Sequence, residues 1–200
     1  MFWPVALLLG LEAPVAEPVV YKVAAEESRM TVHVGTAGLF KMFGHEHNIA
    51  VRGLSGQVDW DPESKAPSRF VLEIDASSLT VADEELSEKD RAQVQSDMET
   101  KALALPQNRR IAFQSAEVRV EKNEGARLQL KLKGTLSLRG VSKPLEVPLT
   151  LDATGDRLTA KGELELESGS WGVPQIAAVG GSVKTKQDLG IAFEIVAVRE

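Results

Sequence analysis

The chain has 200 residues, enough for one substantial hydrophobic core, and 43% of them are hydrophobic against 26% charged, as in an ordinary soluble globular protein. Its formal net charge of −6 argues against nucleic acid as a partner, because phosphate binding needs a basic face. The lack of cysteine excludes disulfides, thiolate metal sites, a cysteine nucleophile and a lipid-modified N-terminal cysteine.

The N-terminal residues have a pattern typical of an export signal. A short apolar run at residues 2–11 is followed by small residues and proline at 13–17. This run is too short for a membrane span, which needs roughly 20 apolar residues, and it suits the apolar region of a secretory signal. No Lys or Arg precedes it, however, and Pro14 stands where a cleavage site prefers a small residue. We expect residues 1–17 to be signal-like and the protein to be periplasmic or secreted; a cytoplasmic apolar tail is the alternative.

Alternation of apolar and polar residues predicts β-strands along most of the chain. Between residues 128 and 138 every even position is leucine except Gly134, so the leucines lie on one face of a long strand. Other strands are expected at residues 29–35, 45–51, 55–60, 70–74, 111–121, 145–151, 158–166 and 191–197. Turn signals separate them, among them Asp61-Pro62, Asn123-Glu124-Gly125, Arg139-Gly140 and Gly155-Asp156.

One stretch departs from this alternation. Residues 82–103 are charged, lack β-branched runs and carry three apolar residues at helical spacing. We expect a helix over about residues 84–102, with Asp83 as its N-cap. Residues 168–184 are glycine-rich and predict an irregular connection before the last strand, in which Trp171 packs at the core or rim, or gates an opening.

Strands that each have one apolar face need a shared interior. A sandwich or a closed barrel provides it, and closure removes the edge strands that invite aggregation. Long strands joined by tight turns favour an all-β, antiparallel, up-and-down barrel of about eight to nine strands, with one helical insertion packed across its mouth or flank. Periodicity alone does not separate a ligand cavity from a filled core.

Several segments resemble a known family. The most specific is Gly134-Thr135-Leu136-Ser137-Leu138-Arg139-Gly140-Val141-Ser142-Lys143-Pro144-Leu145. Weaker similarities lie at residues 21–32, 53–61 and 108–115. Together they resemble the YceI-like family of bacterial polyisoprenoid-binding proteins, over about residues 20–198, and we assign residues 20–200 to one YceI-like domain.

The resemblance implies a lipocalin-like barrel, exported to the periplasm or secreted, that holds an isoprenoid lipid, a quinone or another amphipathic lipid in its interior. It is not a family of known enzymes. We therefore expect a carrier whose partner is a hydrophobic or amphipathic small molecule, with no nucleic acid and no stable transmembrane segment; a homodimer is left open. The side chains expected to line the interior are Phe113, Leu130, Leu132, Leu136, Leu138, Leu149 and Phe193.

The three histidines, His33, His45 and His47, lie close together in the sequence. His45 and His47 share one strand face with the apolar residues that follow them, whereas His33 has apolar neighbours and is expected to point outward. His45 and His47 can be a polar anchor for a ligand head group at the barrel mouth, half of a metal site, or strand-end histidines without a ligand. A metal-binding barrel that uses these two histidines is the alternative function.

Motifs for other chemistry are absent from the sequence. It contains no Gly-x-Ser-x-Gly, no phosphate-binding Gly-Lys-Ser/Thr loop and no Gly-x-Gly-x-x-Gly. Asp59 and Asp61 share a strand face, and Glu84 adjoins Glu85, but carboxylates near turns and helix starts are usually solvated or act as caps. We assign no catalytic residue and do not expect an enzyme.

Overall fold

The structure, a computed structural model, describes residues 17–37, 46–105, 107–178 and 183–200. Twelve strands within these residues form one antiparallel sheet. They are β1 Val19–Val23, β2 Arg29–Ala37, β3 His47–Val51, β4 Leu54–Asp61, β5 Ala66–Asp75, β6 Thr80–Val81, β7 Arg110–Glu124, β8 Arg127–Leu138, β9 Val141–Thr154, β10 Arg157–Glu167, β11 Ala177–Ala178 and β12 Val183–Arg199. The helical segments are α1 Glu88–Asp97, a π-helical turn η4 Met98–Ala102, and the short 3-10 helices η1 Ala25–Glu27, η3 Ala76–Ser78 and η5 Ser168–Trp171.

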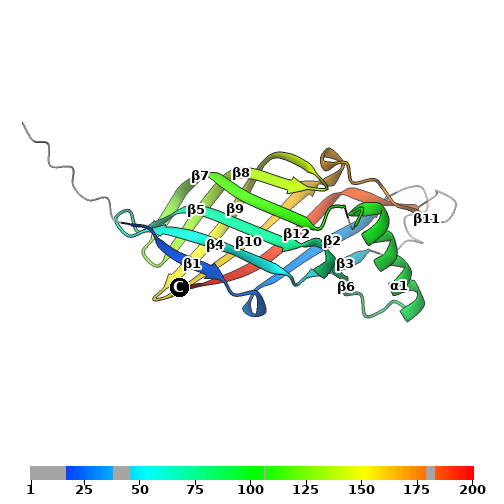
Figure 1. Cartoon of the computed structure of the whole chain (residues 1–200), viewed down its shortest axis with the longest axis horizontal. Coiled ribbons are helices and arrows are strands. Elements are labelled where there is room, and N and C mark those ends of the chain that lie inside the picture. The colour runs from blue at the N-terminus through cyan, green and yellow to red at the C-terminus, as the bar shows by residue number, and fades with distance from the viewer. Residues whose placement is uncertain (1–16, 38–45, 106, 179–182) are drawn as a thin grey trace, which may run out of the picture.

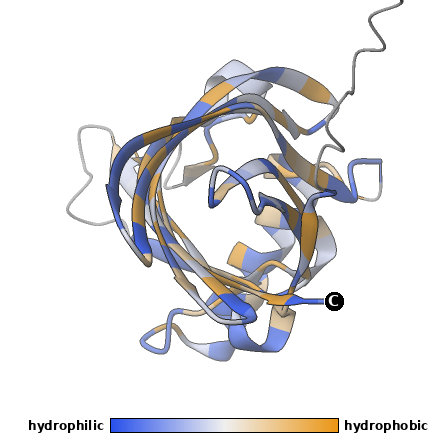
Figure 2. Ribbon diagram, turned by 90° about the vertical axis from the view of Figure 1, so that its left-hand side faces the viewer, coloured by the Kyte–Doolittle hydropathy of each residue, from blue (hydrophilic) through white to orange (hydrophobic). Residues whose placement is uncertain are grey.

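Eight of the strands form a closed barrel, which confirms the predicted fold class. Their order is β1-β4-β5-β7-β8-β9-β10-β12, and the ring closes where Tyr21 of β1 pairs with Arg199 of β12. Figure 2 looks along the barrel and shows these strands arranged in a ring. At one end β2 continues along β12, β3 pairs with β2, and β6 pairs with β3, so the wall is extended there.

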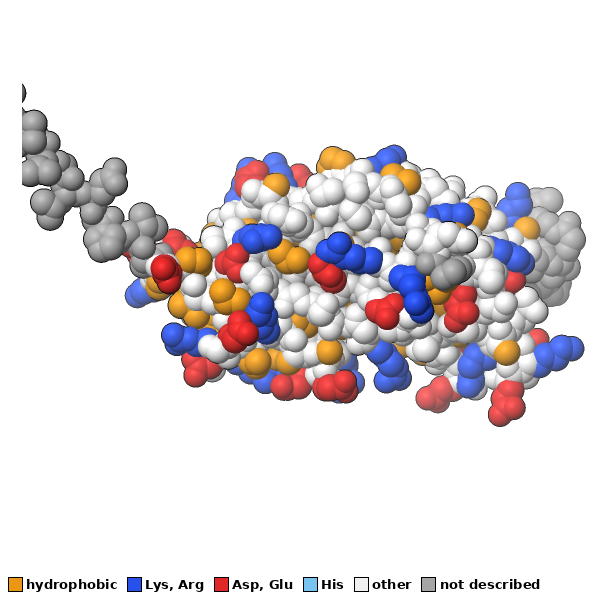
Figure 3. Space-filling model, viewed as in Figure 1, with side chains coloured by type: hydrophobic (Ala, Val, Ile, Leu, Met, Phe, Trp, Pro, Cys, Tyr) orange, Lys and Arg blue, Asp and Glu red, His pale blue; other side chains and the backbone are white. Residues whose placement is uncertain are grey.

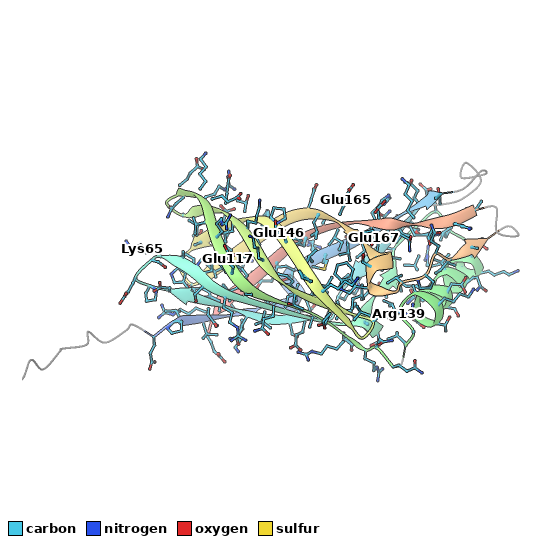
Figure 4. All side chains as sticks on the ribbon, turned by 90° about the horizontal axis from the view of Figure 1, so that it is seen from above. Lys65, Glu117, Arg139, Glu146, Glu165 and Glu167 are labelled. Atoms are coloured by element: carbon cyan, nitrogen blue, oxygen red, sulfur yellow. The ribbon has the colours of Figure 1, made fainter. Side chains whose placement is uncertain are left out.

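Alternation along the strands sets which side chains face the interior. The five leucines of β8 are all buried, whereas the residues between them are exposed or half-buried on the outer face. On that outer face, Lys133 of β8 lies 3.9 Å from Glu117 of β7 and 3.7 Å from Glu146 of β9. Figure 4 labels these two glutamates. The apolar positions of the alternating pattern thus form the inner wall of the barrel, and the polar positions form its charged surface.

The helical insertion lies at one end of the barrel, which we call the helix end (Figure 1). Its position confirms the predicted insertion, but its predicted N-cap was wrong. The N-cap is Ser87, whose Oγ accepts the N–H of Asp90 at 3.1 Å, so α1 begins at Glu88. Asp83 cannot cap the helix because its carboxylate accepts hydrogen bonds from β3 instead. No helix among the described ranges is long and apolar enough to cross a membrane.

The glycine-rich connection is more regular than the sequence predicts. It contains η5 and β11, and β12 already begins at Val183. Trp171 is buried, 5% exposed, and its Nε1–H donates to the backbone oxygen of Leu136 at 3.0 Å. Trp171 thus ties the connection to the barrel wall.

Candidate functional site

The barrel contains a cavity of about 660 Å³, a size within the range of small-molecule sites. Most of its lining is aliphatic and comes from strands on all sides of the barrel, with further side chains from α1 and η4 at the helix end. Representative lining residues are Val32, Ile49, Leu72, Leu164 and Ile191. Such a lining offers dispersion and hydrophobic contacts to an apolar ligand and few hydrogen bonds.

Most of the residues expected to line the interior do border this cavity. They are Phe113, Leu132, Leu136, Leu138, Leu149, Phe193 and His47. Leu130 does not: it is 1% exposed and packed in a cluster with Tyr21 and Leu128, because side chains fill the interior towards the turn between β7 and β8. His45 lies outside the described residues. That any of these side chains contacts a ligand stays a prediction.

The structure adds lining residues that the sequence did not assign. Leu86, Val94 and Met98, the apolar residues of the helical insertion, border the cavity at the helix end. Their helical spacing was the available signal, but it does not indicate which part of the barrel the helix covers.

His47 is held by a carboxylate at the edge of the cavity. Its Nδ1 lies 2.8 Å from Oδ2 of Asp83, and the side chains are only 17% and 10% exposed. The other oxygen of Asp83 accepts the backbone N–H of Asn48 at 2.8 Å, and the guanidinium of Arg91 donates to the Asp83 carbonyl at 2.8 and 3.2 Å. The Asp83 segment is thus fixed from two sides, and it orients the imidazole.

The other described histidine is on the outer face. The His33 side chain is 48% exposed, and its ring nitrogens lie 3.2 Å from Asn48 and 3.4 Å from Glu46. This confirms that His33 points outward. Among the residues that the structure describes, no group of three or more His, Asp or Glu side chains is placed to hold a metal ion. The metal hypothesis for His45 and His47 therefore has no support from the described part of the chain.

The candidate carboxylates elsewhere serve local structure. Hydrogen bonds from the Ser64 hydroxyl and then the Glu63 N–H lower the pKa of Asp61, which organises the turn between β4 and β5. Asp59 accepts a hydrogen bond from Gln57 at 2.8 Å and lies 3.7 Å from Arg69. Both therefore have structural partners.

Polar contacts hold the helical insertion in place. Gln95 accepts the N–H of Val81 and donates to the carbonyl of Leu79, both at 2.9 Å. Arg139, in the turn between β8 and β9, donates to the carbonyls of Lys101 and Ala102 at 2.9 Å (Figure 4). The insertion is thus attached to two different parts of the barrel rim. On the face of the molecule shown in Figure 3, acidic and basic side chains are intermingled.

Comparison with known proteins gives matches in sequence and fold. The family model described as a YceI-like domain matches residues 21–197, and no curated protein matches the chain. BcnA of Burkholderia cenocepacia is similar in structure at 19% identity and a TM-score of 0.64, covering 88% of this chain and 99% of that chain.

Two further solved structures are similar. A polyisoprenoid-binding domain from Saccharophagus degradans, implicated in plant cell wall breakdown, has 12% identity and a TM-score of 0.65, covering 91% of this chain and 99% of that chain. A Campylobacter jejuni YceI protein has 14% identity and a TM-score of 0.58, covering 76% and 84%. At these identities the likeness concerns the fold.

Proposed function

The chain belongs to the YceI-like family, and from this premise we propose that it is a carrier that binds an amphipathic lipid, of the isoprenoid type or similar, inside its barrel. The observation that carries the proposal is the cavity of about 660 Å³ with its aliphatic lining. The polyisoprenoid-binding domain from Saccharophagus degradans, which has a similar fold, adds support for an isoprenoid chain.

The affinity for such a ligand comes from burial of apolar surface. Each Å² removed from water contributes about 25 cal/mol before the costs of binding are subtracted. A long unbranched or isoprenoid chain fits this chemistry, because it offers apolar area along its whole length and needs no hydrogen-bond partners there. A polar group is then expected only at one end of the ligand.

Blocking the cavity tests this function. Leu132 is 3% exposed and lines the cavity, so Leu132→Trp places an indole where the lipid chain would lie. Val198, on β12, is 37% exposed and pairs with Lys22 and Arg157 on the outer face, so Val198→Trp adds the same group outside the barrel. We expect the wild type and Val198→Trp to bind one labelled geranylgeraniol per chain, and Leu132→Trp to bind at least about tenfold more weakly.

Two measurements accompany this comparison. Native mass spectrometry of the wild type, before and after organic extraction, is expected to reveal a co-purified lipid. Circular dichroism checks that Leu132→Trp is folded, and Ile191→Trp, on β12, blocks the cavity from another wall. Binding by both folded, blocked variants at wild-type affinity, or no lipid on the wild type and no uptake, would refute the proposal.

We also propose that the protein is exported, since residues 2–11 are apolar and residues 13–17 have the small residues and proline of a processing region. Intact mass of the periplasmic fraction of a Gram-negative host is expected to show a chain cut between about residues 13 and 17. An uncut chain confined to the cytoplasm would contradict this.

A further inference from the structure

We propose that His47 and Asp83 form a subsite for the polar end of the bound lipid, and that this end carries a hydroxyl group. In this arrangement the hydroxyl donates a hydrogen bond to Nε2 of His47. The proposal rests on the proposed function, because the lipid chain must occupy the cavity for its head to reach this point. It narrows the ligand to alcohols or phenols with a long apolar tail, as opposed to phosphates.

The subsite lies where an apolar cavity meets a polar pair. His47 borders the cavity together with Ile49 of β3 and with Leu86 and Val94 of the helical insertion. At 17% exposure its side chain is largely withdrawn from bulk water. A ligand atom in contact with this ring is therefore surrounded mostly by aliphatic groups, where a hydrogen bond contributes more than it does in water.

Asp83 decides which ring nitrogen is free. An ionised carboxylate can only accept hydrogen bonds, and Oδ1 of Asp83 is already engaged by the N–H of Asn48. The 2.8 Å contact with Oδ2 therefore places a proton on Nδ1 of His47. A neutral imidazole carries one N–H, so Nε2 then presents a lone pair and can accept a hydrogen bond from a ligand.

Gln57 and Ser168, two other polar residues that border the cavity, already have partners within the protein. Gln57 is hydrogen-bonded to Lys22 and Asp59, both at 2.9 Å or less, and the Ser168 hydroxyl donates to a backbone carbonyl at 2.8 Å. For Nε2 of His47, in contrast, the described residues provide no hydrogen-bond partner. Every fully buried side-chain nitrogen or oxygen in these residues has a hydrogen-bond partner. Since Nε2 has none, it is not fully buried and is open to solvent or ligand.

Lys184 and Lys186 favour a different head group. Both border the cavity from β12, and both are exposed to solvent. A phosphate at the end of the lipid would be attracted to these cations, whereas the largely buried imidazole with a free lone pair repels a phosphate oxygen. The burial of His47 and its fixed tautomer favour a hydroxyl head group over a phosphate. Preferred binding of a phosphate is one of the possible outcomes of the test.

The test compares three probes with the same tail: geranylgeraniol, its methyl ether and its phosphate, titrated at pH 8.5, where histidine side chains are ordinarily neutral. The ether cannot donate a hydrogen bond. We expect the wild type to bind the alcohol about fivefold more tightly than the ether, which corresponds to about 1 kcal/mol for one hydrogen bond. We expect no preference for the phosphate over the alcohol.

Three variants locate the effect. Asp83→Asn presents an amide that donates to Nδ1, so the proton moves to Nε2; the alcohol-to-ether ratio is then expected to fall to about one, since the ether can accept. His47→Phe is expected to give the same ratio of about one while it retains ether binding. His33→Phe, on the outer face, is the control and is expected to keep the fivefold ratio.

The outcomes separate the two proposals. Equal binding of alcohol and ether by the wild type, a ratio that persists in both Asp83→Asn and His47→Phe, or a phosphate preference would overturn the subsite and leave the lipid carrier standing. Failure of all three probes to bind the wild type would overturn both proposals.

Discussion

Two glycines in the barrel wall make room for phenylalanine rings that border the cavity. A Cβ on Gly134 would lie 2.7 Å from Cζ of Phe113 and 2.3 Å from the Gln114 carbonyl oxygen. A Cβ on Gly162 would lie 2.6 Å from Cζ of Phe193, its direct partner on β12. The break in the leucine alternation at Gly134 thus has a packing cause in a neighbouring strand.

Gly134→Ala is expected to destabilise the barrel by about 1–3 kcal/mol, the usual cost of overpacking, because the backbone of β7 cannot move away easily. Gly190→Ala is the matched control, since a Cβ there would meet only Cβ of His33, at an ordinary 3.6 Å. Urea denaturation of both variants measures the difference. If the two variants were equally stable, the Phe113 ring and the Gln114 carbonyl would not occupy the space that a Cβ on Gly134 needs.

An exposed ion pair links the turn end of β8 to β9. Arg127 contacts Asp152 through Nε at 2.8 Å and through Nη2 at 3.0 Å. The hydrogen bond from Arg127 is the main cause that lowers the pKa of Asp152, and the same bond raises the pKa of Arg127. Because the carboxyl pKa is lowered in the folded state, the pair contributes stability above the ordinary aspartate pKa of about 3.9 and loses it as the pH falls through the lowered value.

Asp152→Asn is therefore expected to reduce stability at pH 7 by less than about 1 kcal/mol, the usual limit for an exposed pair, with the difference from wild type shrinking towards pH 2.5. Chemical denaturation at both pH values measures it. Asp156→Asn serves as the control, because Asp156 is 78% exposed and lies 3.5 Å from Arg199. A stability loss for Asp152→Asn that is the same at both pH values would contradict the linkage.

At the scale of elements, α1 contributes little fully buried apolar surface to the attachment of the helical insertion. None of the residues of α1 is buried, and its sequence is mainly polar. The buried apolar contacts begin with Met98 of η4 and Leu103 after it. Gln95 supplies the polar attachment to β6, so α1 is expected to be the part of the cavity wall that opens most easily.

Gln95→Ala removes the contacts with Val81 and Leu79 and is expected to speed amide hydrogen exchange in residues 88–102, with smaller changes in the barrel strands. The rate of lipid exchange is expected to rise with it. Gln93→Ala is the matched control for amide exchange, since within the described residues the Gln93 side chain donates to Asp97 on the same helix, at 3.1 Å. Unchanged exchange in Gln95→Ala would place the main attachment elsewhere, for example at Arg139.

At the scale of the whole molecule, closure depends on residues far apart in the sequence. β12 pairs with β11 and then β10 along one edge, and with β2 and then β1 along its other edge. This long strand therefore joins the closed ring to the extended wall at the helix end. Its side chains Ile191 and Phe193 border the cavity, so the strand that closes the ring also lines the cavity.

The sequence alone determined nine of the twelve described strands, their sidedness, and the helical insertion, because these follow from local periodicity that a strand or helix must satisfy to bury its apolar face. Alternation did not predict β1, β6 or β11, and β6 and β11 have only two residues each. The similarity of the Gly134–Leu145 segment also indicated the family. Alternation likewise predicted the inward orientation of His47 and the outward orientation of His33.

Only the tertiary structure decided which inward side chains border the cavity. Leu130 and Leu132 have the same period and belong to the same core cluster, yet Leu132 borders the cavity and Leu130 does not. It also decided that Asp83 holds His47 and does not cap the helix. Both outcomes depend on contacts between distant segments, which alternation within one strand does not encode. The physical reason is that periodicity fixes the face of a side chain, whereas its neighbours depend on how the barrel closes.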